Sequence, residues 1–148
     1  MRETNDSISI LLIEDNEGDI RLTKEALSMG KIKNSLTVLH DGEEAIKHLK
    51  TLRNENPKVL PDLVILDLNL PVIDGLEVLK FIKNDKILAK LPVVVLTTSK
   101  DNDDIKKAYS YHANSFITKP IDWEQFVDVI KSIEEFWLSI VKLPPRSE

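Results

Sequence analysis

Five short apolar runs, rich in Val, Ile and Leu, recur along the chain. They are Ile8–Ile13, Leu36–His40, Leu63–Asp67, Val93–Thr97 and Ser115–Thr118. Their apolar positions do not alternate regularly with polar ones, which is typical of strands that are buried on both faces. The pattern therefore predicts a central parallel sheet that is covered by other elements on each side.

The segments that follow these runs have the apolar spacing of amphipathic helices. The predicted helices span about Glu17 to Met29, Glu43 to Leu52, Leu76 to Asn84, Asp101 to His112 and Asp122 to Val141. Five strand–helix units in a row imply right-handed crossovers. We therefore predict an α/β fold with a doubly wound, five-stranded parallel sheet, (βα)5, in the flavodoxin-like strand order 2-1-3-4-5.

The length of 148 residues suits one domain with a core of its own. We assign residues 8–143 to this domain, residues 1–7 to an N-terminal tail and residues 144–148 to a short Pro-rich C-terminal tail. The first apolar run stops at Glu14 and is too short for a signal peptide or a membrane span. We therefore expect no membrane association.

Charge and cysteine content exclude further classes of function. The chain has 20 basic and 25 acidic residues, a formal net charge of -5, and no dense block of Lys and Arg, so we expect no nucleic-acid partner. It has no cysteine, which excludes disulfides and thiol chemistry and favours a cytoplasmic location.

The candidate chemistry lies where the predicted strands end. Glu14 and Asp15 follow the first run, Asp67 ends the third, Thr97 ends the fourth, and Lys119 and Pro120 follow the fifth. In a doubly wound sheet the carboxyl ends of the strands form one rim, beside the switch point between strands 1 and 3. Each residue alone has an ordinary structural explanation, such as helix capping, but together they indicate a functional site.

Crowded carboxylates raise one another's pKa unless a cation compensates them. Mg2+ prefers carboxylate, water and phosphate oxygens, whereas zinc is disfavoured because no His or Cys lies nearby in the pattern. Three carboxylates, one Lys ammonium and one Mg2+ sum to zero charge, so one carboxylate can act as a nucleophile toward phosphorus. Asp67 is the best candidate because it ends the central strand. Mg2+ and Lys119 would neutralise the phosphoryl oxygens, and Thr97 would donate a hydrogen bond to one of them.

Four motifs, "LLIEDN", "LVILDLNLP", "VVVLTTS" and "FITKP", resemble those of the receiver domains of two-component response regulators, the CheY-like family, over residues 8–141. The resemblance implies that Asp67 is the phosphoacceptor. It also implies that Glu14, Asp15, Asp67 and the backbone carbonyl of Asn69 hold Mg2+. The expected protein accepts a phosphoryl group from a sensor histidine kinase and is a signalling protein, not an enzyme with a substrate of its own.

The same resemblance assigns the residues that read the phosphoryl group. Thr97 corresponds to the switch hydroxyl and Lys119 to the phosphate-sensing amine, and both assist the phosphotransfer. Pro120 is expected to follow a cis peptide bond. Phe116 occupies the position of the switch aromatic, and because it has no hydroxyl its signal must travel by packing.

Three stretches, "LDLNLP", "LPVVVLTTS" and "EEFWLSIVKLP", look like those of the small single-domain regulators that are paired with bacterial phytochrome kinases. This likeness implies a sensor histidine kinase as partner, with a bacterial phytochrome as one candidate. The residues after the fifth run are too few for a DNA-binding output domain. We therefore expect a stand-alone regulator that passes its signal to a downstream protein or to a further phosphotransfer partner.

Two other functions fit part of the pattern. The stretch "DLN" resembles the Asp-x-Asp motif of haloacid-dehalogenase-type phosphatases. However, Asn69 replaces the second acid, and that motif normally follows the first strand. The other alternative is a degenerate receiver that acts only as a scaffold, and the complete set of site residues argues against it.

The last predicted helix would be about 30 Å long, whereas typical strands span about 17–20 Å, so it should overhang the sheet. Its end, "FWLSIV", spreads apolar side chains around more of the helix than one buried stripe needs. We predict a homodimer whose interface contains Phe136, Trp137, Ile140 and Val141. The alternative is that this tail folds back over its own domain.

Overall fold

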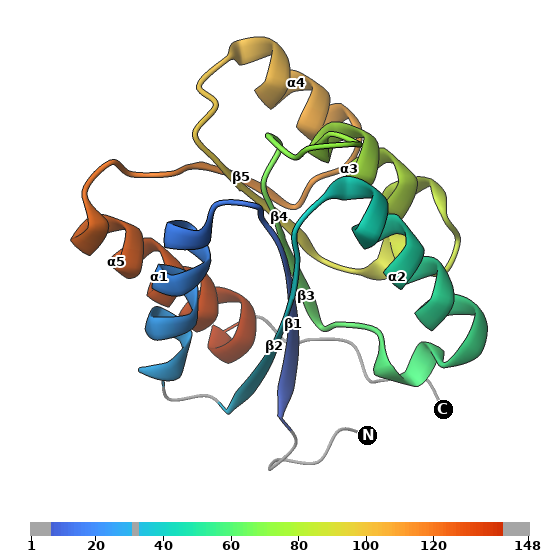
Figure 1. Ribbon diagram of the computed structural model, residues 1–148, viewed down its shortest axis with the longest axis horizontal. Coiled ribbons are helices and arrows are strands. Elements are labelled where there is room, and N and C mark those ends of the chain that lie inside the picture. Colours follow the sequence, from blue (N-terminus) through green and yellow to red (C-terminus); the bar gives the residue numbers. More distant parts are fainter. Residues whose placement is uncertain (1–6, 31–32, 141–148) are drawn as a thin grey trace.

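The computed structural model describes residues 7–30 and 33–140, which form a single parallel sheet with helices on both faces (Figure 1). The strands are β1 (Ile8–Ile13), β2 (Asn34–Leu39), β3 (Leu63–Leu66), β4 (Val93–Thr97) and β5 (Ser115–Thr118). The α-helices are α1 (Glu17–Ser28), α2 (Gly42–Glu55), α3 (Gly75–Asn84), α4 (Asn102–Ser110) and α5 (Trp123–Glu134). Short helical turns are η1 (Pro57–Val59), η2 (Leu88–Lys90) and η3 (Glu135–Ile140).

The strand order is β2-β1-β3-β4-β5, and all neighbouring strands are parallel. This arrangement confirms the predicted α/β class and the doubly wound order. Within the described residues, no helix combines the length and the apolarity that a membrane crossing requires.

The sheet is covered on both faces, as the apolar runs predicted. Leu11 and Ile13 of β1 belong to the core beneath α2, α3 and α4, whereas Ile10 and Leu12 belong to the core beneath α1 and α5. In Figure 1, α1 and α5 lie together on one side of the sheet and α2 and α3 on the other. Every residue of β3 and β4 is buried, because these strands are central and both of their faces are packed.

Each of the five α-helices begins after an Asn or Asp that caps it. The capping residues are Asn16, Asp41, Asp74, Asp101 and Asp122. In each case a side-chain oxygen accepts a hydrogen bond from a backbone N–H of the first turn, which would otherwise have no partner within the helix. The caps fix where the chain turns from a strand end into the following helix.

The edge strand β2 differs from the predicted Leu36–His40. It begins at Asn34, where it pairs with Ile8, and it ends at Leu39. Because β2 has a neighbour on only one side, polar residues are tolerated along it, and its positions alternate between exposed and partly buried until Leu39. Apolarity alone therefore located its centre but not its ends.

The prediction of one continuous final helix is wrong. The α-helix α5 ends at Glu134, and Glu135–Ile140 form the π-helical segment η3. A π-helix widens the turn through i→i+5 hydrogen bonds and is rare, so apolar spacing gave no signal for it.

The residues predicted to form a dimer interface fall into two groups. Phe136 is 51% exposed, whereas Trp137 is half-buried and packs against the core beneath α1 and α5. Their rings meet edge to face with centroids 5.5 Å apart. Trp137 thus contacts its own domain, as the tail alternative expects, while a role in a dimer stays a prediction. The side chain of Ile140 and the whole of Val141 lie outside the described residues.

Candidate functional site

The register of the sheet brings the polar strand ends together. Ile13 of β1 pairs with Leu66 of β3, so the next residues, Glu14 and Asp67, lie on adjacent strand ends. Asp67 still donates its backbone N–H to the carbonyl of Ile13, 3.0 Å away. Thr97 ends β4, the other neighbour of β3, and is fully buried. The predicted convergence at one rim is therefore present in the structure.

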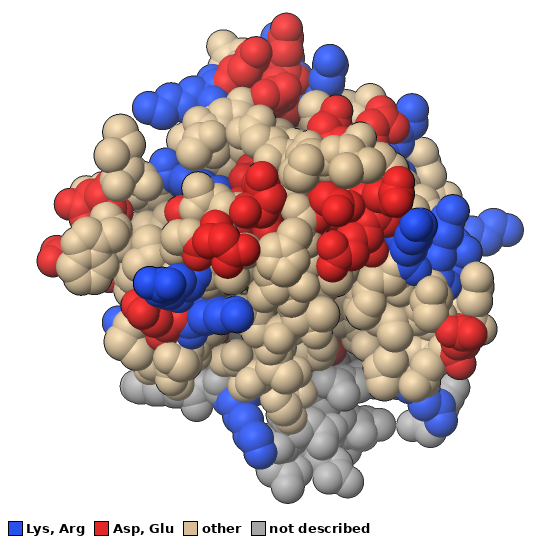
Figure 2. Space-filling model, in the orientation of Figure 1, with Lys and Arg blue, Asp and Glu red and all other residues tan. Residues whose placement is uncertain are grey.

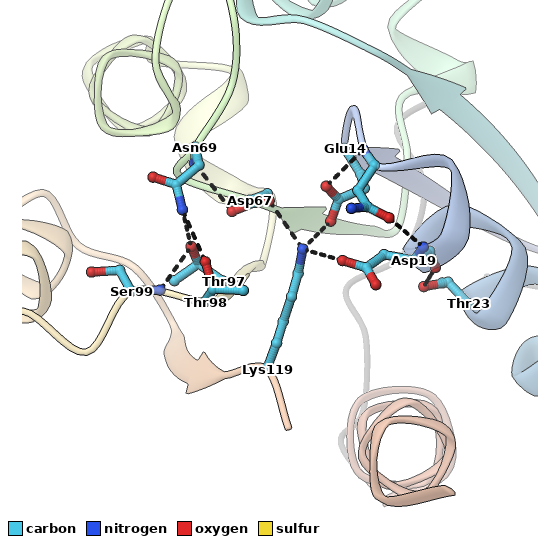
Figure 3. A network of polar contacts seen from close by, with 10 residues as sticks. Glu14, Asp19, Thr23, Asp67, Asn69, Thr97, Thr98, Ser99 and Lys119 are labelled. Atoms are coloured by element: carbon cyan, nitrogen blue, oxygen red, sulfur yellow. Dashed lines mark hydrogen bonds and ion pairs between the residues drawn. The ribbon is translucent and has the colours of Figure 1, made fainter. Parts of the chain in front are cut away.

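Lys119 occupies the centre of this rim. Its backbone N–H donates to the carbonyl of Thr97 (2.7 Å), which fixes the start of the side chain, and only 4% of the side chain is exposed. Its Nζ lies 2.6 Å from Glu14 Oε1, 2.7 Å from Asp19 Oδ2 and 3.0 Å from Asp67 Oδ2 (Figure 3). An ammonium has three N–H donors, so these carboxylates match its whole donor capacity.

The peptide bond between Lys119 and Pro120 is trans, because the described residues contain no cis peptide bond. The prediction of a cis-proline at Pro120 is therefore corrected. The trans form is favoured before proline by about 0.5–1 kcal/mol.

The surroundings shift the pKa values of the two buried acids, Glu14 and Asp67, in opposite directions. Burial raises the pKa of Glu14 to about 7, the Lys119 ammonium opposes the rise, and the neighbouring Asp67 adds to it. Burial also acts to raise the pKa of Asp67, but the Lys119 charge and hydrogen bonds from Thr97 and Asn69 outweigh it and lower that pKa. Asp67 is thus a carboxylate at neutral pH, which is the nucleophilic form.

Lys119 is protonated throughout the physiological range. Burial alone would lower the pKa of its ammonium, but the hydrogen bonds that it donates to Asp19 and Glu14 and the charges of Glu14 and Asp67 raise that pKa instead. The rim therefore holds one fixed positive charge among its acids.

Three carboxylates of the rim could hold a divalent cation. One oxygen each from Glu14, Asp15 and Asp67 lie within 4.8 Å of one another, with Asp15 exposed and the other two buried. These are hard oxygen donors, and an exposed ligand leaves room for water, which fits Mg2+ or Mn2+. Figure 2 shows acidic side chains gathered in the middle of the face that Figure 1 presents, with basic side chains mostly around them.

Asn69 links the phosphoacceptor candidate to the threonines of β4. Its backbone N–H donates to Asp67 Oδ1 (3.1 Å), and its side-chain amide lies 3.4 Å from Thr97 Oγ1 and 3.2 Å from Thr98 Oγ1 (Figure 3). The sequence assigned only the backbone carbonyl of Asn69 to the site. The side chain adds a bridge between β3 and β4 at the place where Thr97 presents its hydroxyl.

Gly75 allows the first turn of α3 to approach the site. Its N–H donates to the carbonyl of Leu68 (2.9 Å), and a Cβ at this position would collide with the carbonyl oxygen of Asp67. Any larger residue would push α3 away from the end of β3.

Phe116 lies in β5, one strand away from Thr97 on β4. It is half-buried against the core beneath α2, α3 and α4, and its backbone N–H donates to the hydroxyl of Tyr109 (3.2 Å). The predicted switch aromatic therefore sits between the sheet and α4, where a change in packing could be passed on.

Asp19 is the site residue that the sequence analysis missed. It lies in the first turn of α1, four residues after Asp15, and contacts Lys119 directly. An acid in the first turn of a helix usually complements the helix dipole, so it carries no signal of its own. Its place in the first turn of the helix that follows Glu14 and Asp15 was the one available indication.

The fold is a parallel, five-stranded α/β fold. Its strand ends carry an acidic cluster, a central carboxylate, a threonine and a buried lysine. Together, these features define a receiver of phosphoryl groups. The family model of the response regulator receiver domain matches residues 10–131, and the chain belongs to this family.

Relatives are similar over nearly their whole length. The response regulator Rcp1 from Synechocystis sp. is 41% identical over 142 residues, covering 96% of this chain and 97% of that protein. The probable methanogenesis regulatory protein FilR2 from Methanothrix harundinacea is 39% identical over 142 residues, covering 96% of this chain and 91% of that protein.

Two solved structures are close in shape. The phosphorylated cyanobacterial phytochrome response regulator RcpA has a TM-score of 0.88 and 44% identity, covering 95% of this chain and 100% of that one. The Mn2+-bound form of Rcp1 has a TM-score of 0.87 and 40% identity, covering 93% of this chain and 99% of that one. The chain is thus a response regulator receiver that is homologous to the phytochrome response regulator RcpA, solved in its phosphorylated form, and to Rcp1, solved with Mn2+ bound.

Proposed function

We propose that Asp67 accepts a phosphoryl group from the phosphohistidine of a sensor kinase, with Mg2+ as cofactor. An Asp67 oxygen attacks phosphorus, the phosphorus–nitrogen bond of the donor breaks, and an acyl phosphate forms. The observation that carries the proposal is the position of Asp67, a buried carboxylate of lowered pKa that belongs to the candidate metal cluster and also contacts Lys119. Incubation with acetyl phosphate and Mg2+ tests it, because one phosphoryl group per chain should appear in the intact mass.

Around the acceptor, the other site residues have separate tasks. Glu14, Asp15 and Asp67, with the backbone carbonyl of Asn69, would hold Mg2+, which supplies positive charge to the phosphoryl oxygens when it is bound. Lys119 contributes the second positive charge. Thr97 presents its hydroxyl next to Asp67 and would move toward the phosphoryl group, and Phe116 would repack in response.

A sensor histidine kinase is the proposed partner, and a bacterial phytochrome is the candidate that the similarity to the phytochrome response regulator RcpA suggests. Ile121 is 99% exposed and Trp123 is 62% exposed, and both follow Lys119 closely in sequence. Apolar side chains of this exposure, which follow the site residue Lys119 in the chain, offer a surface for the kinase domain that carries the phosphohistidine. From the cytoplasm, the signal would pass to a downstream protein or a further phosphotransfer partner.

The role proposed is that of a signalling acceptor and not of a phosphatase. Membership of the receiver family argues against the haloacid-dehalogenase-type alternative. The scaffold alternative predicts that acetyl phosphate leaves the mass of the chain unchanged, so the same incubation separates it from the proposal.

The apparent affinity for Mg2+ should increase with pH up to about 7 and then level off. Glu14 has a pKa of about 7 in the metal-free protein, so below that pH the metal must displace its proton. One displaced proton corresponds to about a tenfold gain in affinity per pH unit. Calorimetric titrations at several pH values on both sides of 7 would measure this.

Glu14→Gln provides the control for this pH dependence. The variant keeps the shape of the side chain but has no proton to displace, so its affinity should be lower and nearly independent of pH. A flat profile for the wild-type protein over the same range would refute the role of Glu14.

We also propose that the protein forms a homodimer through the surface that carries Phe136. Phe136 is 51% exposed and Trp137 is half-buried. Their edge-to-face pair therefore presents apolar area on the surface of η3. Phe136→Asp should shift the sedimentation equilibrium toward monomer. Met29→Asp, at a 58% exposed position that follows α1, is the matched control and should behave like wild type. Equal sedimentation of all three proteins would exclude this interface.

A further inference from the structure

Asp19 is an acid that contacts the phosphate-sensing lysine without belonging to the metal cluster. Its Oδ2 lies 2.7 Å from Lys119 Nζ, as close as the contact of Glu14 at 2.6 Å and closer than that of Asp67 at 3.0 Å. Among the described residues, the carboxylates placed to hold a metal ion together are Glu14, Asp15 and Asp67, and Asp19 is not one of them. Of the three carboxylates on the ammonium, Asp19 is therefore the one that a bound metal does not also engage.

The backbone of Asp19 is held on both sides. Its N–H donates to Asn16 Oδ1 (2.9 Å), and its carbonyl accepts a hydrogen bond from Thr23 Oγ1 (2.8 Å). Thr23 is fully buried, so this anchor has little freedom (Figure 3). The carboxylate is thus presented to Lys119 by a fixed turn of α1 and not by a mobile surface side chain.

The charge of Asp19 also alters the balance of the site. Four carboxylates, one ammonium and one divalent cation leave a net charge of -1 before a phosphoryl group arrives. Because the three N–H donors of Lys119 are all taken, a phosphoryl oxygen must replace one of the carboxylates. With Glu14 and Asp67 drawn toward the metal, Asp19 is the remaining competitor for the ammonium.

We propose that Asp19 is a positioning residue that holds Lys119 back from the phosphoryl group and so sets how readily the receiver enters its phosphorylated state. The inference rests on the proposed function of Asp67 as acceptor. It assigns to α1 a direct part in the switch, through a contact between Asp19 and the residue that follows β5.

The test measures the affinity for beryllofluoride, a mimic of the phosphoryl group on a carboxylate, by calorimetry in Mg2+. Asp19→Asn should bind beryllofluoride about tenfold more tightly than wild type, because a charge-assisted hydrogen bond to Lys119 no longer competes. General structural damage would weaken binding, so a gain in affinity is not expected from a merely structural role. Glu17→Gln, which removes a charge from the exposed side of the same turn, should bind like wild type.

The same substitution in a Lys119→Met background shows whether the gain in affinity depends on Lys119 or only on the loss of a negative charge. There, Asp19→Asn should change the affinity by less than about twofold, because no ammonium remains to be released. An unchanged or weaker affinity of Asp19→Asn, or a gain that persists without Lys119, overturns the inference alone. Absence of beryllofluoride binding by the wild-type protein would overturn the proposed function together with it.

Discussion

Asp67→Asn is expected to take up no phosphoryl group from acetyl phosphate in Mg2+, while the wild-type chain gains one. The amide is a poor nucleophile, and loss of the nucleophile should reduce the rate by a factor on the order of a thousand or more. The variant should still fold, because its side chain has nearly the same shape and its N–H remains bonded to Ile13. Intact-mass spectra over time measure the uptake.

Asp74→Asn is the matched control for this result. Asp74 caps α3 in the same loop, and Asn caps a helix as well as Asp does. It should therefore label at the wild-type rate. Equal labelling of Asp67→Asn and the wild-type protein would show that the acceptor is another residue.

Lys119→Met is expected to lower the free energy of unfolding of the metal-free protein by about 3–5 kcal/mol at a pH of about 8, where Glu14 has lost its proton. The ammonium is the partner of two buried acids, Glu14 and Asp67, and of the partly exposed Asp19. Without it, the carboxylates repel one another in a poorly solvated place, or Glu14 must take up a proton because the ammonium no longer lowers its pKa. Mg2+ should stabilise the variant by more than it stabilises wild type, because the metal then supplies the missing charge. Urea titrations with and without Mg2+ measure both effects.

Lys83→Met distinguishes this effect from the general cost of losing a buried lysine. Lys83 is half-buried, and its Nζ bonds the carbonyls of Ala89 and Leu91 and the side chain of Asn114, with no contact to the acids of the site. Its variant should lose stability by the same amount with and without Mg2+. A Lys119→Met protein as stable as wild type without metal, or one that Mg2+ does not favour, would contradict the electrostatic account.

Much of the fold could be predicted because the same pattern of an apolar strand followed by an amphipathic helix recurs along the sequence. Both-face burial requires nearly continuous apolar strands, so β1 and β4 have the predicted limits and β3 differs only by Asp67. The edge strand β5 is only partly buried, but it also has its predicted limits. Helix starts were close because Asp and Asn caps mark them. The edge strand β2 was less accurate, since packing on one side imposes a weaker pattern.

The candidate site could be predicted where it depends on topology. Once the strand order is known, the residues after Ile13, Leu66 and Thr118 must share one rim, and the structure places them there. Asp19 was missed because its role depends on how far the Lys119 side chain reaches across to α1, which no strand pattern contains.

Other features could not be predicted because the backbone adopts a conformation that the residue type disfavours. Val72 has a φ of 71°, although a branched side chain disfavours the left-handed region, and its exposed turn lies between Asp67 and α3. The N–H of Ile73 bonds the carbonyl of Pro71 (2.9 Å), which closes this tight turn. Strain of this kind is sustained by surrounding contacts and often occurs near functional sites. His112, with a φ of 69°, is a second non-glycine residue in the left-handed region.

Chemical trapping identifies the residue that carries the phosphoryl group, which we propose is Asp67. Wild-type protein phosphorylated with acetyl phosphate in Mg2+ is reduced with borohydride, which converts an aspartyl phosphate to homoserine, and is then digested and sequenced by tandem mass spectrometry. The account predicts homoserine at position 67 and unchanged aspartate at Asp15, Asp19 and Asp74. Homoserine at one of those positions, or none anywhere in a chain that has gained a phosphoryl group, would contradict it.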